Sequence, residues 1–103
     1  MLEKAAHAGS PEAMFYVAVS YDNGYGVKQS DTQQFNWFLK AAEVDVHQGM
    51  ENTARNYKRA KGTVENYQEA LKWYQKAVAH ENANAMIDLG FMYERGFRGS
   101  CKQ

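Results

Sequence analysis

Few of the features that mark a protein's location or chemistry are present in this chain of 103 residues. Its one cysteine, Cys101, cannot form a disulfide within the chain, which excludes a small fold held by disulfides. There is no signal-peptide pattern and no apolar run long enough to cross a membrane. The sequence as written therefore predicts a soluble, cytoplasmic protein without membrane insertion. A periplasmic or secreted location stays open if an N-terminal signal is missing from this sequence.

Charge of one sign is also lacking, because twelve basic and twelve acidic residues give a formal net charge of zero. The strongly positive surface expected of a nucleic-acid-binding protein is therefore absent. The sequence contains no phosphate-binding loop, nucleophile elbow or paired catalytic carboxylates. His7, His47 and His80 have no second ligand at i+4 spacing or in a cysteine motif, which argues against a metal site. We expect neither an enzyme nor a cofactor, and no nucleic-acid partner.

What the sequence does contain is an internal repeat. Tyr21, Tyr57 and Tyr93 follow one another at intervals of 36 residues, with no insertion between them. Such a period is typical of arrays in which each unit buries its apolar face against the next unit. The same interval relates Lys4, Lys40 and Lys76; Ala5, Ala41 and Ala77; Met14, Met50 and Met86; and Trp37 and Trp73.

Local signals divide each repeat into two helices. Ser10 and Pro11 are a good N-cap and first helical residue, and Gly24 and Gly62 lie where helices must break. The first eight residues have the pattern of the end of a further helix. The predicted fold is all-α, with helices at about 11–23, 30–44, 48–59, 66–80 and 83–95.

A helix ending in Tyr-x-x-Gly, a short loop with glycine, and a helix carrying Trp-Tyr-x-Lys-Ala together resemble the Sel-1-like repeat, a relative of the tetratricopeptide repeat. The best match runs from Asn66 to Ala77 and continues through Tyr93 and Gly96. By this resemblance, residues 1–103 form one domain of about two and a half repeats, with units at about 10–45, 46–81 and 82–103, the last incomplete. We expect this domain to be a segment of a longer array.

The resemblance implies a right-handed superhelix, or solenoid, of antiparallel helix pairs whose concave face binds a protein or peptide partner, in an adaptor or scaffold role. An immunity or inhibitor protein that occludes a toxin or an enzyme is the alternative. A cysteine-rich branch of the family is associated with β-lactam hydrolysis, but Cys101 stands alone here, and that reading is disfavoured. The incomplete terminal repeats leave self-association open.

The middle repeat departs from the pattern. Thr53 and Ala54 replace the usual Leu-Gly, Asn56 stands at the position of Met92, and Ala60 replaces a glycine. These replacements predict either weaker packing in that unit or a helix adapted to contact something else.

Side chains that recur with the period are expected to pack in the core, including the Met14, Met50 and Met86 series and both tryptophans. Positions that vary between equivalent helices are free to contact a partner, and aromatic and arginine side chains there are typical of interface hot spots. The predicted partner-binding residues are Phe15, Tyr16, Val19, Asn52, Arg55, Arg59, Ile87, Phe91 and Arg95.

Overall fold

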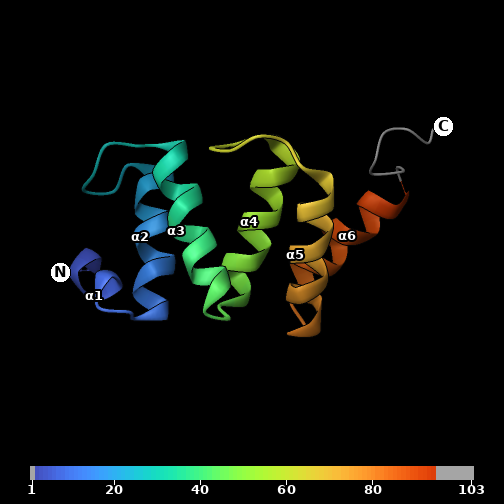
Figure 1. Ribbon diagram of the computed structural model, residues 1–103, viewed down its shortest axis with the longest axis horizontal. Coiled ribbons are helices and arrows are strands. Elements are labelled where there is room, and N and C mark those ends of the chain that lie inside the picture. Colours follow the sequence, from blue (N-terminus) through green and yellow to red (C-terminus); the bar gives the residue numbers. More distant parts are fainter. Residues whose placement is uncertain (1, 95–103) are drawn as a thin grey trace.

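The computed structural model describes the backbone of residues 2–94 and the side chains of residues 4–94. This part of the chain forms six helices and no strand. Each helix packs mainly against the helices that precede and follow it in the chain, so they succeed one another along the long axis (Figure 1). The helices are α1 (Leu2–His7), α2 (Pro11–Asn23), α3 (Asp31–Glu43), α4 (His47–Arg59), α5 (Tyr67–Ala79) and α6 (Ala83–Glu94).

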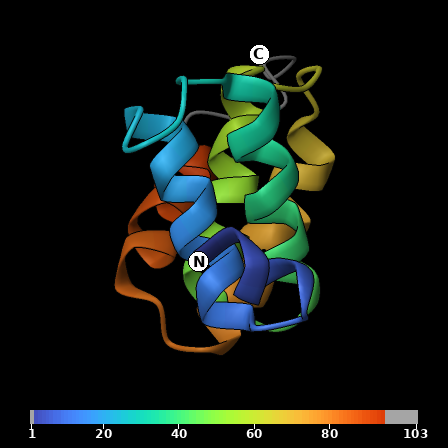
Figure 2. The same ribbon diagram turned by 90° about the vertical axis from the view of Figure 1, so that its left-hand side faces the viewer.

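The stack is elongated, with extents of 48 × 26 × 16 Å. Viewed along its long axis, α2 and α6 lie towards one side and α3 and α5 towards the other (Figure 2). The first helices α2 and α6 thus lie on one side of the stack and the second helices α3 and α5 on the other. The predicted all-α solenoid is confirmed.

Four of the helices begin at side-chain caps, which are Ser10, Ser30, Asn66 and Asn82. The side chains of Ser10, Ser30 and Asn66 accept hydrogen bonds from backbone N–H groups at 3.4, 3.2 and 3.0 Å, each three residues further on. Pro11 occupies the first turn of α2, where its missing N–H costs nothing. The expected bounds differ from the observed ones by at most one residue; the expected helix end at Arg95 lies outside the described residues.

The two loops that follow α2 and α4 use different residues for the same backbone conformation. Gly24 ends α2 with a φ of 75°, in the left-handed region. Ala60 occupies the equivalent place after α4 with a φ of 56°, which is costly for a residue with a Cβ. Two residues later, Gly62 lies against the start of α3, where an added Cβ would be 2.1 Å from the backbone oxygen of Asp31.

Buried apolar residues form two clusters along the stack, one around α2 and α3 and one around α4 and α5. Trp37 and Trp73 are buried in them, as predicted. Met50 is also buried, and Met14 is partly buried against the first cluster. For Met86 the predicted core position is wrong: its side chain is 45% exposed, because among the described residues α6 packs mainly against α5 and no helix covers its other side.

The departures of the middle repeat give it a polar interior. Asn56 and Gln34 are both buried, and the Asn56 amide nitrogen donates to the Gln34 side-chain oxygen at 2.8 Å. This bond joins α4 to α3 at a position where the next repeat carries the buried Met92. Buried amides are tolerated when they are paired, so the replacement exchanges an apolar contact for a specific hydrogen bond.

Candidate functional site

The predicted partner-binding residues lie on α2, α4 and α6, the first helices of the three repeats. Tyr16, Ile87 and Phe91 are 54%, 57% and 48% exposed, and Arg59 at the end of α4 is exposed as well. A helix face that contacts only water is usually polar, so large apolar side chains with this exposure indicate a contact surface. Arg95 lies outside the described residues.

Phe15 and Val19 lie differently from Tyr16, because both are partly buried against the cluster of α2 and α3. The Phe15 ring contacts the rings of Phe38 and Tyr16, with centroid distances of 5.7 and 5.5 Å. Phe15 therefore supports the exposed Tyr16 from beneath, and much of its own surface is used within the fold.

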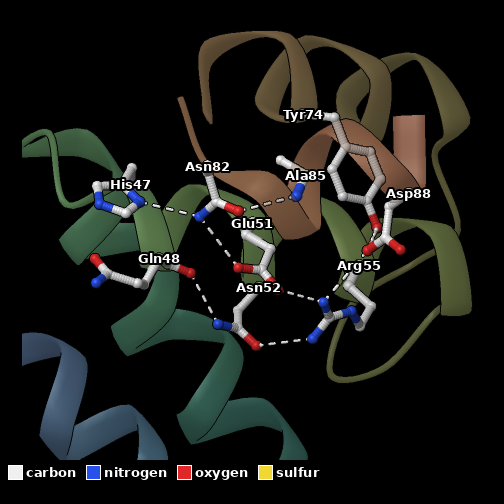
Figure 3. Close-up of polar contacts among 9 residues, drawn as sticks. All are labelled: His47, Gln48, Glu51, Asn52, Arg55, Tyr74, Asn82, Ala85 and Asp88. Atoms are coloured by element: carbon white, nitrogen blue, oxygen red, sulfur yellow. Dashed lines mark hydrogen bonds and ion pairs between the residues drawn. The ribbon is translucent and has the colours of Figure 1, made fainter. Parts of the chain in front are cut away.

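Arg55 and Asn52 belong to a polar network on α4. The guanidinium of Arg55 donates to Glu51 on its own helix, to Asp88 of α6 at 3.3 Å, and to the side-chain oxygen of Asn52 at 3.4 Å (Figure 3). Asp88 also accepts a hydrogen bond from the Tyr74 hydroxyl of α5 at 3.2 Å. The network thus links α4, α5 and α6.

Asn82 extends this network to the start of α6. Its side-chain oxygen accepts from the backbone N–H of Ala85 at 2.9 Å and so caps α6, and its amide nitrogen must therefore face the other way. That nitrogen lies 3.2 Å from Glu51 and 3.0 Å from Nδ1 of His47. Because an amide nitrogen can only donate, Nδ1 of His47 is the acceptor in this contact.

Burial and charge fix the protonation states at the centre of the network. The pKa of the Tyr74 hydroxyl is raised, mainly by burial and then by the Asp88 carboxylate. Burial lowers the pKa of Arg55, but its hydrogen bonds and charge attraction to Glu51 and Asp88 outweigh this effect, and the net pKa is raised. Tyr74 is therefore a neutral donor and Arg55 a permanent cation, so the contacts between α4, α5 and α6 keep the same form around neutral pH.

Sequence reasoning did not include four members of this network in the site, namely Glu51, Tyr74, Asn82 and Asp88. Only the i, i+4 spacing of Glu51 and Arg55 could have indicated a pair. The structure also stacks His47 on His80, with ring centroids 6.0 Å apart, although the two differ in repeat phase. Among the described residues, no three metal-ligating side chains gather into a group.

Comparison with known proteins identifies the repeat. Residues 11–45, 47–82 and 83–103 each match the Sel1 repeat. The chain belongs to the Sel1 repeat family. Proteins with Sel1 repeats generally act in protein–protein interactions.

Solved structures of Sel1 repeat proteins are similar to this one over most of its length. Protein c5321, a protective antigen of uropathogenic Escherichia coli, is 35% identical with a TM-score of 0.90, over 92% of this chain and 20% of that one. A Sel1 repeat protein from Oxalobacter formigenes is 32% identical with a TM-score of 0.80, over 84% and 36%. Cysteine-rich protein B of Helicobacter pylori is 25% identical with a TM-score of 0.78, over 82% and 64%.

One curated relative is chitin synthase regulatory factor 3 of Schizosaccharomyces pombe, which is 32% identical over 95 residues. The match covers 88% of this chain but only 10% of the relative. This chain therefore spans about a tenth of the length of the curated relative that it matches. None of its described helices has the length and apolar character needed to cross a membrane.

Proposed function

We propose that this Sel1 domain is a protein-interaction module that presents the exposed side chains of α2, α4 and α6 to a protein or peptide partner. The observation that carries the proposal is the exposure of Tyr16 on α2 and of Ile87 and Phe91 on α6, on either side of the polar residues of α4. Tyrosine and arginine are enriched among interface hot spots. The proposed contact residues remain those predicted from the sequence.

The polar network supports this role by making the surface rigid. Arg55 is held by Glu51, Asn52 and Asp88, so its guanidinium does not have to be ordered when a partner arrives. A binding surface that is ordered in advance loses less conformational entropy on association. The side chains of α4 and α6 therefore meet a partner in a fixed arrangement.

A binding role rather than catalysis also agrees with the relatives. One relative is named as a regulatory factor of chitin synthase, and another is described as a protective antigen. The cysteine-rich Helicobacter pylori protein shares the fold, whereas this chain has a single cysteine. We therefore propose an adaptor or scaffold rather than an enzyme.

Peptide phage display on the immobilised domain tests the proposal, because a random peptide library can be selected for binding to this surface directly. The peptides that it enriches should bind the Tyr16→Ala/Ile87→Ala double variant at least about tenfold more weakly, a loss of about 1.4 kcal/mol. Tyr25→Ala is the control, because Tyr25 is also an exposed tyrosine but lies in the loop after α2. Equal affinity for the double variant, or no enrichment on the wild-type domain, would count against the proposal.

A further inference from the structure

Asn23 and Gly24 form the only asparagine–glycine pair in the sequence, and this pair lies where α2 meets the loop that follows it. Asparagine is a chemically labile residue, because the backbone nitrogen of the next residue can attack its side-chain amide. Glycine hinders that attack least, because it has no Cβ. Asn23 is exposed, so water and base can reach the reacting groups.

Hydrogen bonds at the end of α2 hold both of these reacting groups. The backbone N–H of Gly24 donates to the carbonyl of Ser20 at 2.7 Å. The side-chain nitrogen of Asn23 donates to the carbonyl of Val19 at 3.0 Å. Both acceptors belong to the preceding turn of α2, so the N–H of Gly24 is directed at that turn and away from the Asn23 side chain. The attack therefore requires the last turn of α2 to open first.

An ion pair ties this turn to the next repeat. Oδ1 of Asp22 lies 2.8 Å from Nζ of Lys61, which follows α4 and is 39 positions away in the sequence. Both side chains are partly exposed, so the pair adds little to the global stability of the fold. Opening of a helix end, however, is opposed only by the few contacts that it breaks. Because Asp22 directly precedes Asn23, this ion pair is one of those contacts.

We propose that Asn23 is a site of spontaneous deamidation, and that the ion pair of Asp22 with Lys61 slows the reaction by holding the last turn of α2 closed. In the reaction, the backbone nitrogen of Gly24 gives its proton to a base in solution and bonds to Cγ of Asn23. The bond from Cγ to Nδ2 breaks, and the amide nitrogen takes a proton from solvent and leaves as ammonia. Water then opens the five-membered ring at either carbonyl, which yields aspartate or isoaspartate.

Either product changes the end of α2. A carboxylate at position 23 places a negative charge at the C-terminal end of a helix, where the helix dipole disfavours it. Isoaspartate also adds a methylene group to the backbone, which displaces the left-handed cap at Gly24 from its hydrogen bond to Ser20. The modification thus loosens the start of the loop between α2 and α3.

Peptide mapping by mass spectrometry tests the proposal on the whole chain. After incubation at mildly alkaline pH, trypsin cleavage at Lys4 and Lys28 releases residues 5–28, in which Asn23 is the only side chain with an amide. This peptide should contain aspartate and isoaspartate, formed about tenfold more slowly in the folded chain than in the chain unfolded in guanidinium chloride, because two hydrogen bonds must break first. Asn23→Gln should remove the signal.

Lys61→Met isolates the contribution of the ion pair. It should speed deamidation of the folded chain about two- to fivefold, the size that a partly exposed ion pair supports, and should leave the rate in the unfolded chain unchanged. Lys72→Met, which instead breaks the ion pair with Glu69 on α5, is the matched control and should change neither rate. Urea unfolding checks that both variants keep the same global stability.

Three outcomes would overturn the proposal. The first is a tryptic peptide that stays unmodified in the folded chain while the unfolded chain reacts to completion. The second is an equal rate in the folded and unfolded wild-type chains, which would show that the end of α2 does not protect Asn23. The third is a Lys61→Met variant that reacts no faster than the wild type. These measurements need no binding partner.

Discussion

At the scale of single residues, the centre of the structure is Arg55, which neutralises two carboxylates from different helices. Glu51 is buried on α4 and Asp88 is partly buried on α6. Removing one partner of a buried ion pair leaves the remaining charge without compensation, which costs more than the pair itself contributes. We therefore expect that removing the charge of Arg55 alone destabilises the fold more than removing the charges of Arg55 and Glu51 together.

Arg55→Met should lower the free energy of unfolding by about 1–3 kcal/mol, because Glu51 is left buried without its cation. Adding Glu51→Gln to this variant should restore part of the loss, because the neutral amide no longer needs a positive partner. Urea unfolding followed by circular dichroism measures both changes. If Arg55→Met unfolds at the wild-type urea concentration, the network does not stabilise the fold.

The raised pKa of Tyr74 predicts a loss of stability at high pH. Because the folded state disfavours the phenolate, the stability contributed by the neutral hydroxyl is complete below the pKa of an unfolded tyrosine. It is then lost as the pH rises above about 10. In urea unfolding at a series of pH values, Tyr74→Phe should show a smaller fall above pH 10 than the wild-type chain, and Tyr25→Phe should match the wild type. Equal falls in all three would show that Tyr74 ionises as easily in the folded chain as in the unfolded one.

At the scale of helices and loops, much of the structure could be predicted from the sequence, because its signals are local. Ser30 and Asn66 cap helices through hydrogen bonds to residues three positions away. Gly24 adopts the left-handed conformation that ends α2 without help from distant residues. The contact of Arg55 with Asp88 joins residues 33 positions apart and has no local signal. The exposure of Met86 also depends on which helix covers α6, which periodicity alone does not reveal.

The close approach of Gly62 to α3 gives a prediction about the loop after α4. Gly62→Ala should destabilise more than Gly26→Ala, although both glycines have a φ near 75°. The left-handed conformation costs either alanine about 1–2 kcal/mol, but only at position 62 would the Cβ collide with the Asp31 carbonyl, since nothing lies within 4 Å at Gly26. Differential scanning calorimetry compares the two variants. Equal melting temperatures would contradict the close approach.

Ala60 provides the opposite test at the end of α4. Its left-handed conformation is one that glycine adopts without strain. Ala60→Gly should therefore raise the free energy of unfolding by up to about 1 kcal/mol, reduced by the larger entropy of the unfolded glycine. The same substitution at Ala79, the last helical residue of α5, serves as the control and should destabilise, because glycine loses more conformational entropy on folding than alanine. A destabilised Ala60→Gly variant would show that the end of α4 is not strained.

At the scale of the whole molecule, the helices form a stack with α2 and α6 on one side and α3 and α5 on the other (Figure 2), and α4 packs against both α3 and α5. Packing between successive helices builds the stack, and the network of Arg55 joins the last two repeats across it. Exposed apolar and aromatic side chains lie on the first helices at positions that the core does not use. The central claim is that a partner binds along the first helices α2, α4 and α6.

Amide chemical-shift mapping of the isotope-labelled domain with a peptide enriched by display tests that claim most directly. The account predicts that the largest shifts fall on α2, α4 and α6, at Tyr16, Asn52 and Ile87, while the exposed residues of α3 and α5, such as Asn36 and Gln75, stay unchanged. Shifts confined to α3 and α5 would place binding on the opposite layer and contradict the account.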